Sequence, residues 1–156
     1  MRVLFMCTAN SCRSILSEAM FNHLAPQGFE AVSSGSFPKG QVLPRSLTTL
    51  QQAGISTEGL SSKGNDAFAN NLPDIVITVC DKAAGESCPV YFGPALKSHW
   101  GLEDPSNVVG DEAAVDSAFR ATLARIESRC KAFLDLPFHS LSRDEFKREL
   151  DSIGAL

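Results

Sequence analysis

The stretch Arg2-Val-Leu-Phe-Met-Cys7-Thr-Ala-Asn-Ser-Cys12-Arg13-Ser14 determines how the rest of the chain is interpreted. Its first residues, 2–6, form a short and continuous apolar run, which is typical of a strand buried on both faces. Apolar side chains then recur at helical spacing over residues 14–24, which predicts a helix. The sequence therefore predicts a strand, a loop and a helix in succession. That loop lies at the carboxyl end of a strand, where open α/β sheets bind ligands.

The remaining sequence repeats this alternation of strands and helices. Further strands are predicted over 30–34, 74–79 and 97–100, and further helices over 44–53, 63–70, 111–134 and 142–152. The last helix begins with a capping box, in which the side chains of Ser142 and Glu145 accept from each other's backbone N–H groups. Such alternation predicts a parallel sheet with helices on both sides. We therefore expect one three-layer α/β domain over residues 1–156, with 136–156 as a C-terminal helical extension.

The composition is that of a globular protein. Hydrophobic residues make up 44% of the 156 residues and charged residues 21%, which argues against disorder as the overall state. The net charge is −4 and no basic stripe is present, so the sequence predicts no nucleic-acid partner. The longest apolar runs are far shorter than the roughly 20 residues that cross a bilayer, and the N-terminus lacks a signal peptide's apolar segment. We therefore expect a cytoplasmic protein with no membrane partner.

Five cysteines are present, at positions 7, 12, 80, 88 and 130. An odd number in a cytosolic chain argues against a disulfide scaffold, which leaves metal binding, redox chemistry, nucleophilic catalysis or burial in the core. The histidines His23, His99 and His139 lack ligand spacing, so we predict no zinc site. Cys130 lies on the apolar face of the predicted helix 111–134, so we expect it in the core.

The loop between the first strand and the first helix has the residues that an oxyanion site needs. Because five residues separate Cys7 from Arg13, the loop can curl so that its backbone N–H groups form a nest for an anion. The helix N-terminus adds positive charge, and the Arg13 guanidinium can donate to two oxygens of a tetrahedral anion. The predicted substrate-binding residues are Thr8, Ala9, Asn10, Ser11, Cys12, Arg13 and Ser14.

Cys7 lies at the base of this loop and is the candidate nucleophile. The positive field of the loop is expected to lower the pKa of Cys7 and to hold it as a thiolate, with Ser14 donating a hydrogen bond to the sulfur. The alternative is that Cys7 ends a buried strand and has no further role, since cysteine is commonly buried. The glycine patterns of nucleotide-binding loops are absent from the sequence, so no nucleotide site is predicted.

The pattern Cys7-x5-Arg13-Ser14 after an N-terminal strand resembles the low-molecular-weight protein tyrosine phosphatase superfamily. This resemblance implies a four-stranded parallel sheet and a covalent intermediate between the cysteine sulfur and phosphate. It also implies a general acid in an Asp-Pro pair late in the chain, which Asp104-Pro105 matches. The alternative for Asp104 is a turn residue, because Asp-Pro pairs commonly begin turns.

The residues after the Asp-Pro pair differ from those of the phosphatases. Members of that family usually place a tyrosine there, against the aromatic substrate, whereas Ser106 and Asn107 follow here. The single tyrosine of this chain, Tyr91, lies elsewhere. The difference favours a small inorganic oxyanion as the substrate.

Two cysteines, Cys80 and Cys88, follow the predicted strand 74–79. A hydrolase has no use for them, whereas a reductase needs thiols that supply two electrons. Together with residues 99–105, these cysteines resemble the arsenate reductases built on the phosphatase fold.

That resemblance implies a role for each residue. Cys7 attacks arsenate held by the loop amides and Arg13, while Asp104 protonates the departing hydroxide. Cys80 then attacks Cys7 and releases arsenite, and Cys88 attacks Cys80 to move the disulfide to the pair Cys80–Cys88. An external reductant, either thioredoxin or glutaredoxin with glutathione, restores the thiols, and no tightly bound cofactor is implied. Phosphate and sulfate are expected to compete with arsenate for the loop.

Some reductases of this kind bind potassium beneath the loop through Asn, Glu, Ser and Asp side chains. Asn10, Glu18 and Ser33 resemble three of these ligands, and Lys63 aligns with the fourth. We therefore predict no bound metal, with the Lys63 ammonium group neutralising Glu18 in place of a cation. The alternative for Lys63 is a solvated surface residue.

Other interpretations remain open at this point. Cys12 either packs beneath the loop or protects Cys7 by forming a disulfide with it. The chain can also be a phosphatase acting on phosphotyrosine or small phosphoesters, or a redox sensor without catalytic activity. For the disulfide relay, residues 81–87 must fold back, because a disulfide needs Cα atoms about 5.5–6 Å apart whereas eight extended residues span about 27 Å.

Overall fold

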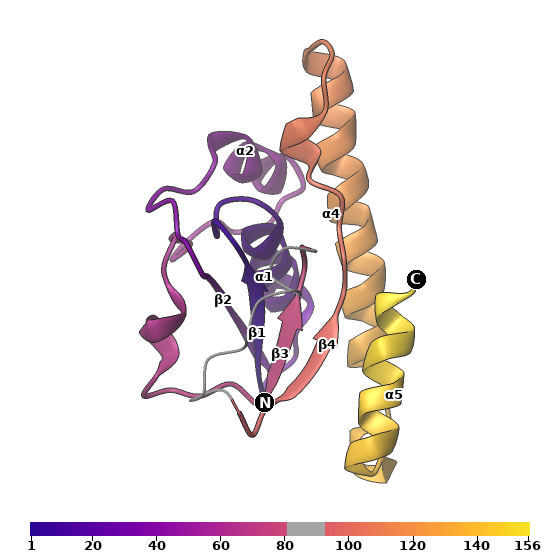
Figure 1. Ribbon diagram of the computed structural model, residues 1–156. Coiled ribbons are helices and arrows are strands. Elements are labelled where there is room, and N and C mark those ends of the chain that lie inside the picture. Colours follow the sequence, from indigo (N-terminus) through magenta and orange to yellow (C-terminus); the bar gives the residue numbers. More distant parts are fainter. Residues whose placement is uncertain (81–92) are drawn as a thin grey trace.

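A computed structural model describes residues 1–80 and 93–156 of the chain. At its centre is a sheet with the strand order β2-β1-β3-β4 (Figure 1). The strands are β1 (Arg2–Cys7), β2 (Glu30–Gly35), β3 (Ile75–Thr78) and β4 (Leu96–His99). Every pair is parallel, and the register places Met6 between Ser34 and Thr78. The predicted α/β fold with a four-stranded parallel sheet is confirmed.

The helices of the described residues connect these strands and follow the last of them. They are α1 (Arg13–Leu24), α2 (Pro44–Gln52), α4 (Glu112–Leu134) and α5 (Arg143–Gly154). Short 3-10 turns occur at η1 (Asn65–Phe68), η3 (Pro105–Asn107) and η4 (Phe138–Ser140). The predicted capping box of Ser142 and Glu145 opens α5. Within the described ranges, we find no helix with the length and apolar character that crossing a membrane requires.

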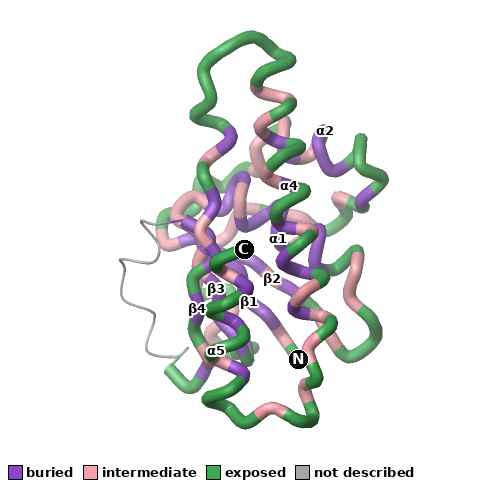
Figure 2. The backbone as a smooth tube through the Cα atoms, turned by 90° about the vertical axis from the view of Figure 1, so that its right-hand side faces the viewer, coloured by how far each residue is buried: buried purple, intermediate pink, exposed green. Residues whose placement is uncertain are grey.

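Helices α1 and α4 cover one face of the sheet, and α5 packs against α4 and along the edge strand β4 (Figure 1). The Phe133 ring is central to this layer, with its centroid 5.5 Å from that of Phe21 and 6.2 Å from that of Trp100. Burial is concentrated in β1 and β3, whereas the outer turns of α5 are largely exposed (Figure 2). This packing fixes the carboxyl ends of the strands, where the candidate site lies.

The opposite face of the sheet carries a smaller apolar cluster. Leu4, Met6 and Val76 pack there against Phe68 from η1. No α-helix from the described ranges covers this face, so a second helical layer stays a prediction. Residues 81–87, whose folding back we predicted, lie outside the described residues.

Two predicted elements differ from the structure. The helix predicted over 63–70 is only the turn η1, because the chain before it is extended: Gly35 and Gly64 form an isolated parallel bridge, and Asn65 and Asp66 are poor helix formers. The last strand ends at His99 and not at Trp100. The Trp100 side chain turns to α5, where Nε1 donates to the Leu150 carbonyl at 2.9 Å.

Candidate active site

Residues 7–14, here named the anion loop, connect β1 to α1 at the carboxyl end of the sheet (Figure 1). Gly35, the last residue of β2, lies against this loop. A Cβ atom at Gly35 would be 2.4 Å from the Thr8 carbonyl oxygen and 3.0 Å from the Asn10 backbone nitrogen, so a larger residue would displace the loop. Sequence reasoning missed Gly35, because the contact joins distant parts of the chain. A glycine directly after a predicted strand was the one available signal.

The carbonyl groups of the anion loop point outward and are paired with the chain around it. The N–H groups of Ser36, Phe37, Lys39 and Leu43 donate to the carbonyl oxygens of Cys7, Thr8, Ala9 and Ser11, at 3.3, 2.9, 2.9 and 3.0 Å respectively. Because the C=O and N–H of one trans peptide point in opposite directions, the loop N–H groups turn inward. Among residues 1–80 and 93–156, none accepts a hydrogen bond from the N–H groups of 9–14. The loop therefore presents inward donors, as an anion nest requires.

Asn10 holds the loop in this curled shape. Its φ of 48° lies in the left-handed region, which asparagine adopts more readily than most residues. The fully buried side chain donates to Ser14 Oγ at 2.7 Å and to Ser33 Oγ at 3.0 Å, and it accepts from the Lys63 N–H at 2.9 Å. The expected Ser14–Cys7 hydrogen bond is absent from the contacts of the described residues. Ser14 instead accepts from Asn10 and helps to fix the loop.

Arg13 is the first residue of α1, whose first turn contains no acidic residue. Its Nη1 donates to the Leu102 carbonyl at 3.1 Å, and its Nη2 lies 3.5 Å from Asp104 Oδ2. A guanidinium group has more N–H donors than these two contacts use, so Arg13 retains donors for an oxyanion. The structure thus places Arg13 between the anion loop and the Asp104 segment.

Asp104 is both a turn residue and a neighbour of Arg13. Its Oδ1 accepts from the Ser106 N–H at 3.0 Å and from Ser106 Oγ at 2.6 Å, which caps η3. Its Oδ2 faces Arg13. The two interpretations of Asp104 are therefore compatible, because the turn orients the carboxyl group toward the anion loop.

The thiols of Cys7 and Cys80 are neighbours at the base of the loop, close enough for Cys80 to affect the pKa of Cys7. Both are buried, with 5% and 2% of their surfaces exposed, and Thr8 Oγ1 lies 3.6 Å from Cys80 Sγ. The hydrogen bond with Cys80 and burial raise the pKa of Cys7 well above its ordinary value. Arg13 and the Thr8 N–H lower that pKa, but their effect is smaller. The expected lowering of the Cys7 pKa is therefore not found in this arrangement, because Cys80 and burial outweigh Arg13.

The other cysteines have different surroundings. Cys12 is buried beneath the loop, and burial raises its pKa to about 11, although a hydrogen bond with Ser46 acts in the other direction. Cys130 lies in the core as predicted, and burial raises its pKa to about 12. These two cysteines, like Cys7 and Cys80, are reduced in the structure. Cys88 lies outside the described residues.

The sequence profile of the low molecular weight phosphotyrosine protein phosphatases matches residues 2–149. This chain belongs to that family. Among curated relatives, the arsenate reductase of Bacillus subtilis (strain 168) is 29% identical over 133 residues, which cover 85% of this chain and 94% of that protein.

Solved structures of the phosphatase family superpose on this chain. One, described as an arsenate reductase in the phosphate binding state, has a TM-score of 0.70 and 25% identity, covering 85% of this chain and 95% of that one. The low molecular weight protein tyrosine phosphatase from T. tengcongensis has a TM-score of 0.69 at 21% identity, covering 84% of this chain and 95% of that one. The latter likeness concerns the fold alone.

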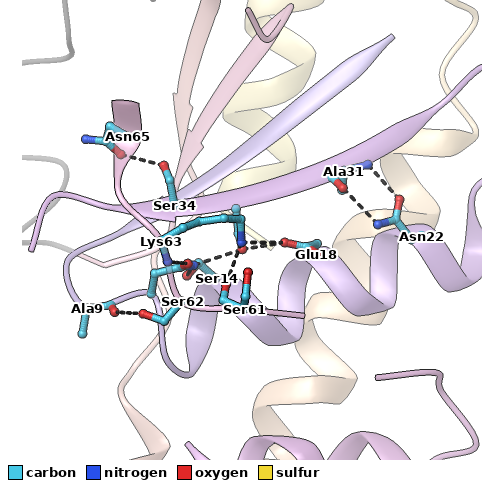
Figure 3. A network of polar contacts seen from close by, with 12 residues as sticks. Ala9, Ser14, Glu18, Asn22, Ala31, Ser34, Ser61, Ser62, Lys63 and Asn65 are labelled. Carbon is cyan, nitrogen blue, oxygen red and sulfur yellow. Dashed lines mark hydrogen bonds and ion pairs between the residues drawn. The ribbon is translucent and has the colours of Figure 1, made fainter. Parts of the chain in front are cut away.

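Beneath the anion loop, this member of the phosphatase family carries an internal ion pair (Figure 3). Lys63 Nζ lies 3.8 Å from Glu18 Oε1 and donates to the Ser61 carbonyl at 2.7 Å, while Ser33 Oγ donates to Glu18 at 2.6 Å. Burial raises the pKa of Glu18, whereas Ser33 and Lys63 lower it. Burial also lowers the pKa of Lys63, against the effect of Glu18. Lys63 therefore lies at ion-pair distance from Glu18, as predicted, whereas its replacement of a bound potassium ion stays a prediction.

Replacing Lys63 with methionine is expected to destabilise the protein in a pH-dependent way. Without the ammonium group, the buried Glu18 carboxylate loses the Lys63 cation beside it, and the pKa of Glu18 rises further. A carboxyl group with a raised pKa in the folded state lowers stability as pH rises above its unfolded pKa of about 4.3. We expect a loss of about 1–3 kcal/mol at pH 7 and a smaller loss at pH 4.

Urea unfolding at both pH values measures this effect. Lys39→Met is the matched control, since Lys39 is an exposed lysine on the segment that borders the same loop. Equal losses at pH 4 and pH 7 in Lys63→Met would show that Lys63 does not stabilise the Glu18 carboxylate.

Proposed function

We propose that this chain is an arsenate reductase in which Cys7 attacks arsenate and Cys80 supplies the second thiol. The observation that carries the proposal is the proximity of the buried thiols of Cys7 and Cys80 at the base of the anion loop. Cys7 ends β1, and Cys80 follows the adjacent parallel strand β3, so one sulfur can attack the other with little movement of the chain. The arsenate reductases among the relatives support the same reaction.

Substrate binding uses the anion loop and Arg13. The inward N–H groups of residues 9–14 and the N-terminus of α1 attract an oxyanion, and the Arg13 guanidinium donates to its oxygens. Phosphate and sulfate have the same tetrahedral shape, so they are competing ligands. Ser106 and Asn107 stand where the phosphatases usually have a tyrosine, which favours arsenate over an aromatic phosphate ester.

The first chemical step joins the Cys7 sulfur to arsenic and breaks one As–O bond. A Cys7 thiol and HAsO₄²⁻ give a thiol-arsenate, Cys7–S–AsO₃²⁻, and water. Asp104 donates a proton to the departing hydroxide, and the Cys7 proton restores Asp104 to its acid form. The Cys7 proton leaves as the sulfur attacks, because the thiolate is the nucleophilic form of cysteine.

The second step reduces arsenic. The Cys80 sulfur attacks the Cys7 sulfur, a disulfide forms, and the S–As electron pair leaves with arsenic, which is released as arsenite after protonation. Cys88 then attacks Cys80 and moves the disulfide to Cys80–Cys88. Thioredoxin, or glutaredoxin with glutathione, returns this disulfide to thiols in the cytoplasm. No tightly bound cofactor takes part.

Arsenate-dependent NADPH consumption tests the function. The purified protein is assayed with thioredoxin and thioredoxin reductase, and separately with glutaredoxin, glutathione and glutathione reductase. We expect steady consumption and arsenite production with one of the two systems. Absence of turnover with both, together with hydrolysis of p-nitrophenyl phosphate, would identify a phosphatase, the alternative that the family description favours.

Asp104→Asn is expected to slow the first step about 10²–10³-fold, because asparagine cannot protonate hydroxide. Binding of sulfate should persist, since Arg13 and the loop amides are unchanged. Quenched single-turnover arsenite formation measures the rate. Asp111→Asn is a matched control, because Asp111 likewise caps a helix, by accepting from the Ala114 N–H at 2.9 Å. An unchanged rate in Asp104→Asn would show that Asp104 does not act as the acid and has only a structural role in the turn.

A further inference from the structure

Arg129 is a buried cation that the proposed reaction does not use. It lies on α4 with 2% of its surface exposed. Its Nη1 donates to the Gly101 carbonyl at 3.0 Å, and its Nη2 donates to the carbonyls of Gly154 and Leu156 at 3.1 and 3.2 Å. Within the described ranges no Asp or Glu side chain is among its hydrogen-bond acceptors, and its Nε has no hydrogen-bond partner. The guanidinium group is therefore held by main-chain oxygens of residues 101, 154 and 156.

The first of these carbonyls belongs to the segment that carries the candidate acid. Gly101 precedes Leu102, whose carbonyl accepts from Arg13, and Asp104 follows two residues later. The Leu102 N–H donates to the Val79 carbonyl at 3.0 Å, so the segment continues the pairing of β3 with β4. Arg129 thus contacts the same backbone segment that carries the two partners of Arg13, the Leu102 carbonyl and Asp104.

The other two carbonyls come from the end of α5 and the residues after it. A helix C-terminus leaves carbonyl groups unpaired and favours a cation, so Arg129 suits this place. The end of α5 is closely fitted: a Cβ atom at Gly154 would be 2.4 Å from the His99 carbonyl oxygen. Figure 1 shows this end of α5 beside β4 and α4. The hydrogen bonds of Arg129 therefore link residues 154–156 to the segment that leads to Asp104.

This arrangement is costly for a residue that only fills space. Burial lowers the pKa of Arg129, and nearby Arg125 lowers it further. Replacing a buried charge with an apolar side chain of similar volume is often neutral or stabilising. The contacts of Arg129 thus point to a role in fixing geometry rather than in adding stability.

We propose that Arg129 is a positioning residue for Asp104, tying the 101–104 segment to the C-terminal end of α5. The expected effect on the reaction rate rests on the proposed function. The expected effect on the position of the 101–104 segment rests on the hydrogen bonds of Arg129 alone. Loss of Arg129 then lets the 101–104 segment move relative to Arg13, so that Asp104 no longer meets the departing hydroxide in the correct place.

A double-mutant cycle tests the kinetic consequence. Arg129→Met is expected to slow single-turnover arsenite formation about tenfold when Asp104 is present, and less than about twofold in the Asp104→Asn background. Arg129→Lys keeps a cation at this position and should recover part of the rate. Such a recovery would support loss of the Arg129 contacts, rather than loss of folding, as the cause of the slowing in Arg129→Met. Equal slowing in both backgrounds would show that Arg129 does not act through Asp104, and would overturn the proposal.

Hydrogen exchange gives a second test that needs no substrate, so its result is separate from any failure of arsenate turnover. Arg129→Met should exchange the amides of Leu102 and Ser106 at least about tenfold faster, with α1 unchanged. Arg125→Met is the matched control, because Arg125 donates to the Leu156 carbonyl at 2.9 Å, whereas the Gly101 carbonyl accepts from Arg129. Unchanged exchange at Leu102 and Ser106 in Arg129→Met would refute the positioning role.

Discussion

Serine in place of Cys80 is expected to lower steady-state arsenate reduction at least about a thousandfold. Without the second thiol, the Cys7–arsenic adduct has no sulfur beside it to attack the S–As bond, and arsenic is not reduced. Because Cys80 lies beside Cys7 and both thiols are buried, we propose Cys80, and not Cys12 or Cys130, for this role. NADPH-coupled turnover measures the loss.

Oxyanion binding should survive in Cys80→Ser, because the inward amides of 9–14 and Arg13 remain. Sulfate protection of Cys7 against iodoacetamide reports that binding. Cys130→Ser is the matched control, since Cys130 is equally buried but lies on α4, away from the loop. Wild-type turnover by Cys80→Ser would assign the second thiol to another residue.

Lysine in place of Arg13 is expected to lower both oxyanion affinity and turnover by about 10²-fold or more. The Arg13 guanidinium spans the Leu102 carbonyl and Asp104 Oδ2 while donating to the anion, which the single ammonium group of lysine cannot reproduce. Titration with sulfate and turnover with arsenate measure the two effects. Arg45→Lys, an arginine paired with Glu112 at the protein surface, is the control. Near-normal turnover by Arg13→Lys would contradict the bidentate contact.

The sequence indicated the parts of the site that depend on local pattern. Apolar residues 2–6, a loop ending at Arg13 and a helix after it determine where the anion loop lies, since strand and helix periods are local properties. The resemblance to a known family added Asp104, Cys80 and the Lys63–Glu18 pair. The structure places Asp104 beside Arg13, Cys80 beside Cys7 and Lys63 beside Glu18.

Other parts of the site depend on contacts between distant residues, which no local pattern reveals. The closeness of Gly35 to Thr8 follows from the register of β2 on β1. The pKa of Cys7 was expected to fall because of the positive field of the loop, yet it rises because Cys80, which follows β3, and burial outweigh Arg13. Arg129 gave no signal, since an arginine on a helix is usually solvated.

The most direct test of the Cys7–Cys80 reaction is a single turnover without external reductant. The reduced protein is mixed with excess arsenate in the absence of oxygen, and arsenite, free thiols and disulfide-linked peptides are counted in the same sample. We expect about one arsenite per chain, loss of about two thiols, and, in the Cys88→Ser variant, a disulfide between Cys7 and Cys80. Arsenite formation with all thiols intact, or no arsenite at all, would contradict it.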